Sequence, residues 1–348
     1  MRYLWGFLAF VPIAGALGWW LHAPAPWVFF ASAAAIVPLS RLLGKATEEL
    51  AAHTSHVVGG LLNATLGNAA ELIITILALR AGLTDLVKAS ITGSIIGNLL
   101  LVLGAALFAG GLARPTLRFN KEGAGVTSSM MTLSVTALVI PAVLVFTQPH
   151  RPVAEVGVSL AVALVLIGCY GLSLVFMLGT HAGLVGNSRV ESESRPDWST
   201  RRAIVVLVLA TVGVAFMSEL LVGATEEAGR GLGLSHMFVG TIIVPIIGNA
   251  AEHATAVLMT LKNKTDLAVS IAVGSSTQVA LFVAPVLVLI ALVLGRRMDF
   301  VFTPLEVVAV GAAVAITNII VRDGESNWFE GVQLLAVYAI LAAAFYWY

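Results

Sequence analysis

Charged side chains are scarce in this sequence. Asp, Glu, Lys and Arg make up 11% of the 348 residues and hydrophobic residues 59%, whereas soluble domains carry roughly 25% charged residues. The apolar runs are long enough for membrane-crossing helices rather than for the shorter strands of a membrane β-barrel. These features exclude a soluble globular protein and predict an all-α integral membrane protein.

The sequence also has only one cysteine, a net charge of zero and none of the common hydrolase signatures. Cys169 is the single cysteine, so no intrachain disulfide forms. The 19 basic and 19 acidic residues balance to a net charge of zero, which gives no indication of a nucleic-acid partner. Neither HExxH nor GxSxG occurs. The sequence therefore predicts a protein that is not an enzyme and whose main surroundings are the lipid bilayer.

Eleven apolar stretches have the length of a transmembrane helix. They are residues 4–22, 26–43, 55–80, 85–110, 122–147, 153–180, 202–222, 235–261, 267–295, 302–321 and 328–347. The first stretch lacks a clear small-residue cleavage site, so we interpret it as a retained, peripheral helix and not as a signal peptide.

An internal repeat relates the two halves of the chain at an offset of 181 residues. Gly67–Glu71 then falls on Gly248–Glu252, Thr84-Asp85-Leu86 on Thr265-Asp266-Leu267, and Gly93-Ser94 on Gly274-Ser275, with no gap. Each copy contains five predicted spans, and five is odd, so the copies enter the membrane from opposite sides. The predicted parts are an N-terminal helix (1–24), a first repeat (25–187), a polar connection (188–201) and a second, inverted repeat (202–348). Transporters built in this way bind their substrate where helices are interrupted.

Each copy of the repeat carries the same pentapeptide inside an apolar stretch. Gly67 to Glu71 reads Gly-Asn-Ala-Ala-Glu, and Gly248 to Glu252 repeats it. An acid near the bilayer centre costs about 2.5–3.5 kcal/mol even on a permissive insertion scale, so its double occurrence favours a functional role over an interhelical hydrogen bond. Gly67, Gly248 and Pro245 predict a locally loosened helix, whose freed carbonyl groups become available as ligands.

Further oxygen donors lie on the same helices and on the helix that follows each of them. They are Asn68, Asn249, Ser94, Asn98, Ser275 and Gln278. Carboxylate, carboxamide and hydroxyl oxygens without a thiolate suit a hard divalent cation, and Ca²⁺ takes about 6–8 of them. Glu71 and Glu252 together neutralise one such ion. His253 is interpreted either as a second proton-handling group or as an interfacial hydrogen-bonding residue.

Two neighbouring acids in a poorly hydrated site hold protons when no cation is present. Burial and like-charge repulsion both disfavour the ionised form of a carboxyl group. Cation binding then expels the protons, because the site holds either the metal or the protons. This exclusion predicts a cation/proton antiporter.

The repeat motifs resemble those of the Ca²⁺(cation)/H⁺ exchanger family, within the cation/Ca²⁺ antiporter superfamily. In the first repeat the pentapeptide precedes Lys88-Ala89-Ser90 and Gly93–Leu100. In the second it precedes His253, Asp266-Leu267 and Gly274–Phe282. The resemblance covers essentially the whole chain, including the extra first helix and the central connection.

The resemblance implies an N-terminal helix and two inverted bundles of five helices. It also implies a prokaryotic family member that lies in the cytoplasmic membrane and exports Ca²⁺ in exchange for H⁺ by alternating access. Glu71 and Glu252 would bind the cation or protons, with the six Asn, Ser and Gln side chains named above in supporting roles. It also implies a homotrimer. Ca²⁺ is then the transported substrate, and no cofactor is expected.

Other modes of transport stay open at this point. A Na⁺-driven Ca²⁺ exchanger would favour a Gly-Thr-Ser-x-Pro-Glu style of motif, where this chain has Asn and Ala. Mn²⁺ or Na⁺ as the exported ion is a further variant, and a cation channel would conduct without proton countertransport. The acidic residues Glu191, Glu193 and Asp197 of the 188–201 connection fit a solvated linker, with cation sensing as the alternative.

Basic residues predict the orientation of the chain. Thirteen of the 19 Lys and Arg residues fall on the side of the N-terminus, which makes that side cytoplasmic. With eleven spans, a reporter fused after Tyr348 is expected to read as extracytoplasmic, and one inserted in the 188–201 connection as cytoplasmic. Reporters that both read the same side would contradict the span count and the inverted repeat.

Overall fold

Helices make up nearly all of the computed structural model, which describes residues 6–147, 152–181 and 196–348. Most of the 188–201 connection, residues 188–195, therefore lies outside the described residues. One short antiparallel pair joins β1 (Leu117–Arg118) to β2 (Glu325–Ser326). The predicted all-α membrane fold is confirmed.

Eight described helices are long and apolar enough to cross a membrane. They are Ala25–Ala51, Thr84–Ala113, Lys121–Thr147, Val156–Thr180, Thr200–Leu232, Thr265–Val293, Pro304–Val321 and Trp328–Trp347. Two bent helix pairs, Val57–Leu66 with Ala69–Arg80 and His236–Gly248 with Ala250–Leu261, raise the number to ten if each is one span. The first predicted span forms only the shorter apolar helix Phe10–Trp20, below the ~20 residues that a span needs. The structure thus gives eight to ten spans over the described residues, and the eleventh stays a prediction.

The described helices pack into two compact units, and each unit takes helices from both predicted repeats. Unit 1 consists of the described residues of Met1–Val87, Ser188–Ala251 and Phe345–Tyr348. Its elements are α2 (Phe10–Gly15), the π-helix η1 (Ala16–Trp20), α3 (Ala25–Ala51), α4 (His56–Leu66), α5 (Ala69–Arg80), α11 (Thr200–Leu232), α12 (His236–Phe238), the π-helix η4 (Val239–Ile243) and α13 (Val244–Gly248). The division of the chain into two repeats stays a prediction.

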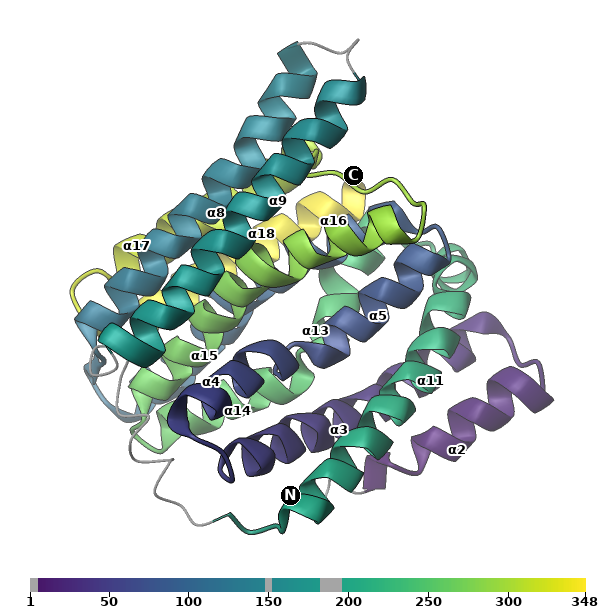
Figure 1. Ribbon diagram of the computed structural model, residues 1–348, viewed down its shortest axis with the longest axis horizontal. Helices are drawn as coiled ribbons and strands as arrows, with labels where there is room; N and C mark the ends of the chain where they lie inside the picture. The colour runs from purple at the N-terminus through teal and green to yellow at the C-terminus, as the bar shows by residue number, and fades with distance from the viewer. Residues whose placement is uncertain (1–5, 148–151, 182–195) are drawn as a thin grey trace. The chain divides into compact units, whose positions relative to one another are not determined.

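The long helices α3 and α11 form the core of unit 1, with α2 against both of them (Figure 1). The side chain of Ser199 starts α11 by accepting a hydrogen bond from the backbone N–H of Arg202 at 3.3 Å. Gly233 ends the helix in the left-handed region, at φ +67°, a conformation that favours glycine. Gly213 of α11 lets the helices approach closely, because a Cβ there would lie 3.0 Å from Cδ2 of Leu39 on α3.

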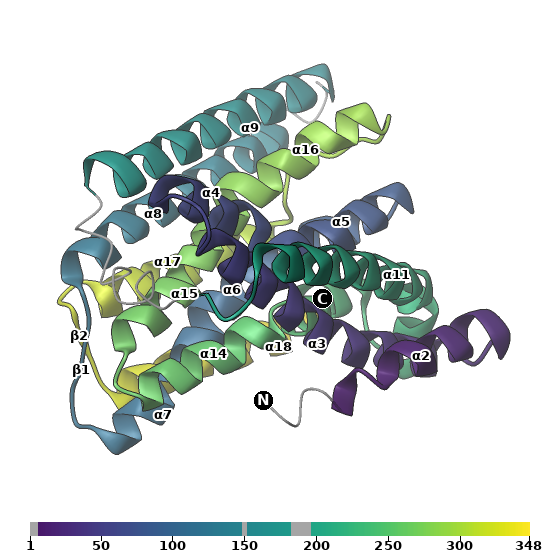
Figure 2. The ribbon, with the colours of Figure 1, turned by 60° about the horizontal axis from the view of Figure 1, so that its bottom comes forward.

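Unit 2 consists of the described residues of Lys88–Asn187 and Glu252–Ala344. Its elements are α6 (Thr84–Ile96) from Lys88 on, η2 (Gly97–Val102), α7 (Leu103–Ala113), β1, α8 (Lys121–Thr147), α9 (Pro152–Val175), η3 (Phe176–Thr180), α14 (Ala250–Leu261) from Glu252 on, α15 (Thr265–Gln278), η5 (Val279–Val283), α16 (Ala284–Val293), α17 (Pro304–Val321), β2 and most of α18 (Trp328–Trp347). Figure 2 shows α9 running beside α8 and α16.

Glycine allows the backbones of α7 and α18 to touch within unit 2. A Cβ on Gly331 would meet the backbone of Phe108 and lie 2.7 Å from the carbonyl oxygen of Gly104. A Cβ on Gly104 would in turn lie 3.1 Å from the carbonyl oxygen of Gly331. Small residues at such a crossing let membrane helices pack backbone to backbone.

This contact predicts the effect of Gly331→Ala. The added methyl group has no room unless the helices move apart, which costs about 1–3 kcal/mol or more, so the thermal midpoint in detergent should fall by several degrees. Gly168→Ala on α9 is the matched control, since a Cβ at Gly168 meets nothing within 4 Å, and it should leave the midpoint unchanged or slightly raised. Equal midpoints for the two variants would contradict the packing described for α7 and α18.

Candidate functional site

Both pentapeptides lie at breaks between helices. The helix bends by 40° between Val57–Leu66 and Ala69–Arg80, and by 60° between His236–Gly248 and Ala250–Leu261. Asn68 has φ −96° and ψ 16°, and Asn249 has φ −100° and ψ 8°. These values lie in the sparsely populated bridge region between helix and strand, where many active-site residues occur. The predicted loosening of the helix at each motif is therefore confirmed, with the same backbone conformation in both copies.

Within unit 1, Glu71 of the first motif lies against Gly248 of the second. A Cβ on Gly248 would stand 3.7 Å from Cγ of Glu71 and 3.9 Å from Cδ1 of Ile74. Glu71 is buried, as are Asn68 and Asn249. The fold of unit 1 thus brings the acid of the first motif against the glycine of the second.

Glu252 and His253 begin the part of α14 that belongs to unit 2, and both side chains are half-buried. Glu252 lies in the first turn of α14, as Glu71 lies in the first turn of α5. The N-terminal end of a helix carries a partial positive charge that stabilises a carboxylate in its first turn. The proton-handling interpretation of His253 stays a prediction.

Within unit 2, α15 crosses the end of α6 and the following η2, with hydrogen bonds between buried polar groups. The amide Nδ2 of Asn98 donates to Oγ of Ser275 at 3.1 Å. The hydroxyl of Ser276 donates to the carbonyl oxygen of Ile95 at 3.3 Å. Ile95 and Ser276 are 181 positions apart, the offset of the sequence repeat, so this bond joins equivalent points of the two copies. The sequence did not indicate this bond of Ser276, because its equivalent in the first repeat is the apolar Ile95.

The remaining site candidates of unit 2 surround the same crossing. Ser94 is buried on α6 and Gln278 is half-buried at the end of α15. The oxygen Oδ1 of Asn98 is buried, and no group in the described part of the chain donates a hydrogen bond to it. This oxygen is thus a candidate ligand, whereas the Nδ2 atom of the same amide is used to hold Ser275.

Short π-helices follow the two crossing helices at equivalent positions. η2 covers Gly97–Val102 and η5 covers Val279–Val283, which differ by the repeat offset to within one residue. π-Helical turns inside α-helices occur frequently at functional sites. Over the residues that the structure describes, His, Cys, Asp and Glu side chains do not gather in groups of three or more.

Comparison with known proteins decides the family. The family model described as sodium/calcium exchanger protein matches residues 24–179 and 202–347. The Ca²⁺/H⁺ antiporter of Synechocystis sp. is 48% identical over 359 residues, covering 98% of this chain and 96% of that protein. The Ca²⁺/H⁺ antiporter ChaA of Bacillus subtilis is 43% identical, covering 97% and 96%.

The chain belongs to the Ca²⁺(cation)/H⁺ exchanger family.

The solved structure of native YfkE agrees with this assignment. It superposes on the chain with a TM-score of 0.86 at 40% identity and covers 99% of both chains. The predicted membership of the family is thus confirmed, and with it a multi-span membrane transporter. The roles of the individual site residues, the homotrimer, the cytoplasmic membrane and the positions of the termini stay predictions.

The Asn98–Ser275 bond can be measured by a double-mutant cycle. Asn98→Ala and Ser275→Ala each remove one partner, and the double variant removes both. A buried hydrogen bond between membrane helices predicts a coupling free energy of about 0.6 kcal/mol, with an upper range near 1.7 kcal/mol, from thermal or denaturant unfolding in detergent. Strictly additive effects of the two substitutions would show that the two side chains do not interact.

Proposed function

We propose that this protein is a secondary antiporter that exports Ca²⁺ from the cytoplasm in exchange for H⁺. Glu71 and Glu252 bind either Ca²⁺ or protons, and the site opens to the two sides of the membrane in alternation. The names of the relatives support the pair of exchanged ions, since the proteins of Synechocystis sp. and Bacillus subtilis are both called Ca²⁺/H⁺ antiporters.

One observation supports this function most strongly, namely the matched pair of helix breaks. Asn68 and Asn249 share one unusual backbone conformation, and an acid follows each of them by three residues, in the first turn of the next half-helix. In membrane transporters, interrupted helices of this kind place half-helix ends and freed backbone carbonyls at the ion site. A purely structural acid would not require the same break twice.

The chemistry of the site follows from its charge. A divalent cation in a medium of low dielectric constant needs two negative charges close by, and the two glutamates supply them. The helix N-termini behind Glu71 and Glu252 stabilise the charged carboxylates while the cation is bound. When the cation leaves, protons take its place on the carboxyl groups, so the site holds either the metal or the protons. The amides and hydroxyls of Asn68, Asn249, Asn98 and Ser275 are the predicted supporting ligands, and because they are uncharged they do not change the charge balance.

Flux into proteoliposomes tests the function. The purified protein should take up ⁴⁵Ca²⁺ when a pH gradient is imposed, and a Na⁺ gradient should not replace it. Uptake driven only by Na⁺ would indicate a sodium/calcium exchanger, and uptake without any countertransported ion would indicate a channel. Mn²⁺ and Na⁺ added in excess show whether another cation is the better substrate.

The two acids are tested by conservative substitution. Glu71→Gln and Glu252→Gln keep the size and hydrogen-bonding capacity of each side chain but remove one charge. One remaining carboxylate cannot neutralise Ca²⁺, so pH-driven uptake should fall by at least about 100-fold in either variant. Asp variants keep the charge, and because Ca²⁺ sites are flexible they should retain more uptake than the Gln variants.

Glu325→Gln is the matched control. It removes one acid of unit 2 whose side chain is half exposed in an ion pair with Arg118, and surface pairs of this kind contribute little. Its uptake should equal that of the unsubstituted protein. Near-normal uptake by a Gln variant of Glu71 or Glu252 that elutes as a monodisperse peak would contradict the two-carboxylate mechanism.

A further inference from the structure

The segment that leads into α17 is folded inward rather than exposed. Met298, Phe300 and Phe302 alternate along it, and all three are buried. The backbone N–H of Phe300 donates to the hydroxyl of Ser159 on α9 at 3.0 Å. The segment therefore has a defined path through unit 2. The two residues between the buried ones, Asp299 and Val301, contact α6.

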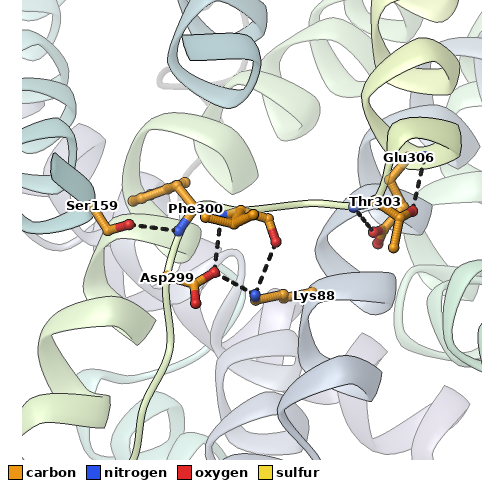
Figure 3. Close-up of polar contacts among 7 residues, drawn as sticks. Lys88, Ser159, Asp299, Phe300, Thr303 and Glu306 are labelled. Carbon is orange, nitrogen blue, oxygen red and sulfur yellow. Dashed lines mark hydrogen bonds and ion pairs between the residues drawn. The ribbon is translucent and has the colours of Figure 1, made fainter. Parts of the chain in front are cut away.

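Lys88 of α6 forms two hydrogen bonds to this segment (Figure 3), and we call this connection the cationic tie. Its Nζ atom donates to Oδ1 of Asp299 and, at 3.0 Å, to the carbonyl oxygen of Val301. The same carboxylate oxygen of Asp299 accepts the N–H of Val301 at 2.9 Å. The Lys88 and Asp299 side chains are only 14% and 27% exposed, so the pair is much better shielded from solvent than a surface ion pair.

A second hydrogen-bonded connection, between α6 and the start of α17, lies one helical turn further along α6. The hydroxyl of Thr92 donates to Oε1 of Glu306 at 3.2 Å. The other oxygen of Glu306 accepts the N–H of Thr303 at 2.8 Å, and the N–H of Glu306 donates back to the Thr303 hydroxyl, which is the reciprocal capping of a helix start. Both oxygens of this fully buried acid are thus used to fix the first turn of α17 to α6.

The tied helix is the one that carries two candidate ligands. Ser94 and Asn98 follow Lys88 by six and ten residues, or about 9 and 15 Å along a helix axis. α17 also packs against η2, which contains Asn98. Lys88 and Thr92 therefore fasten to α17 the stretch of α6 that leads directly to these ligands. An ion pair shielded in this way is weak support for stability, and in some proteins such a pair specifies one geometry.

The second repeat lacks the same arrangement. The offset of 181 places Val269 and Val273 at the positions of Lys88 and Thr92. In that copy Asp266 of α15 holds the segment before α8 instead, by accepting the backbone N–H of Asn120. The cationic tie is thus a feature of one repeat and is not required by the shared helix pattern.

We propose that Lys88 is a positioning residue for the cation site: by holding Asp299 and Val301 it fixes α6, and thereby Ser94 and Asn98, relative to the start of α17. The idea rests on the proposed function, since it takes Ser94 and Asn98 as cation ligands. It predicts that loss of the tie weakens cation affinity without removing the chemistry of exchange.

The test compares Lys88→Met, Lys88→Arg and Arg118→Met by two measurements. In pH-driven ⁴⁵Ca²⁺ uptake, Lys88→Met should raise KM by about 5-fold or more with Vmax within about 2-fold, a pattern that reports weakened binding. Lys88→Arg retains the positive charge, although with a different donor geometry, and its KM should lie closer to that of the unsubstituted protein than the KM of Lys88→Met does. Arg118→Met breaks an exposed ion pair of the same unit and should leave KM unchanged.

Hydrogen–deuterium exchange separates this idea from the proposed function, because it does not require transport. The N–H groups of Phe300, Val301 and Thr303 are all hydrogen-bonded, so a peptide covering 298–303 should exchange slowly in the unsubstituted protein and faster in Lys88→Met. Unchanged exchange, or faster exchange with an unchanged KM, would overturn the positioning role. Absence of uptake by the unsubstituted protein would refute the proposed function instead.

Asp299→Asn covers the case in which Lys88→Met does not fold. It keeps the Lys88 bond to Val301 and removes the charge of the partner, so an intermediate KM and intermediate exchange are expected. A folded Asp299→Asn variant with unchanged KM and unchanged exchange would also overturn the proposal.

Discussion

The cost of charge and of unpaired backbone in a medium without water is the constraint on which this structure depends. Bilayer hydrocarbon tolerates helices because each helix satisfies its own polar groups. Any break in a helix, and any carboxylate beside it, therefore needs compensation from the protein. The chain accepts that cost twice, at Asn68 and at Asn249, and places an acid in the first turn after each break. The helix N-terminus that the break creates offsets part of the cost of the acid, so the break and the acid belong to one arrangement.

Several other polar groups of unit 2 are held by specific partners. Asn98 uses its amide nitrogen to hold Ser275, and Ser276 holds the backbone of Ile95. Lys88 and Thr92 bind Asp299 and Glu306 from the segment before α17. Glycine contributes in another way, since Gly104 and Gly331 bring α7 and α18 into backbone contact. These contacts fix the positions of the helices more than they stabilise the fold, because hydrogen bonds between membrane helices each contribute only about 0.6 kcal/mol on average.

Much of the fold could be predicted from the sequence because hydropathy and repetition are local properties. The spans follow from the length of apolar runs, and the helix breaks follow from Gly67, Gly248 and Pro245. The family followed from the pentapeptides and the residues after them. The length of the first helix could not be predicted, since hydropathy over residues 4–22 does not reveal that the apolar helix described there is Phe10–Trp20. The sequence analysis names Lys88 in the Lys88-Ala89-Ser90 motif and as a basic residue but assigns it no partner, because Asp299 lies 211 positions away. Thr303 and Glu306 have the spacing of a capping pair, but the bond from Thr92 depends on tertiary packing that no local pattern encodes.

The central claim is that one site holds either Ca²⁺ or protons. Calorimetric titration of the purified protein with Ca²⁺, repeated in buffers of different ionisation enthalpy, measures the number of protons released per ion bound. The account predicts a release that approaches two protons per Ca²⁺ at low pH, where the empty carboxyl groups are protonated, and that declines as the pH rises. Ca²⁺ binding with the same enthalpy in every buffer, at every pH, would mean that no protons are displaced and would contradict it.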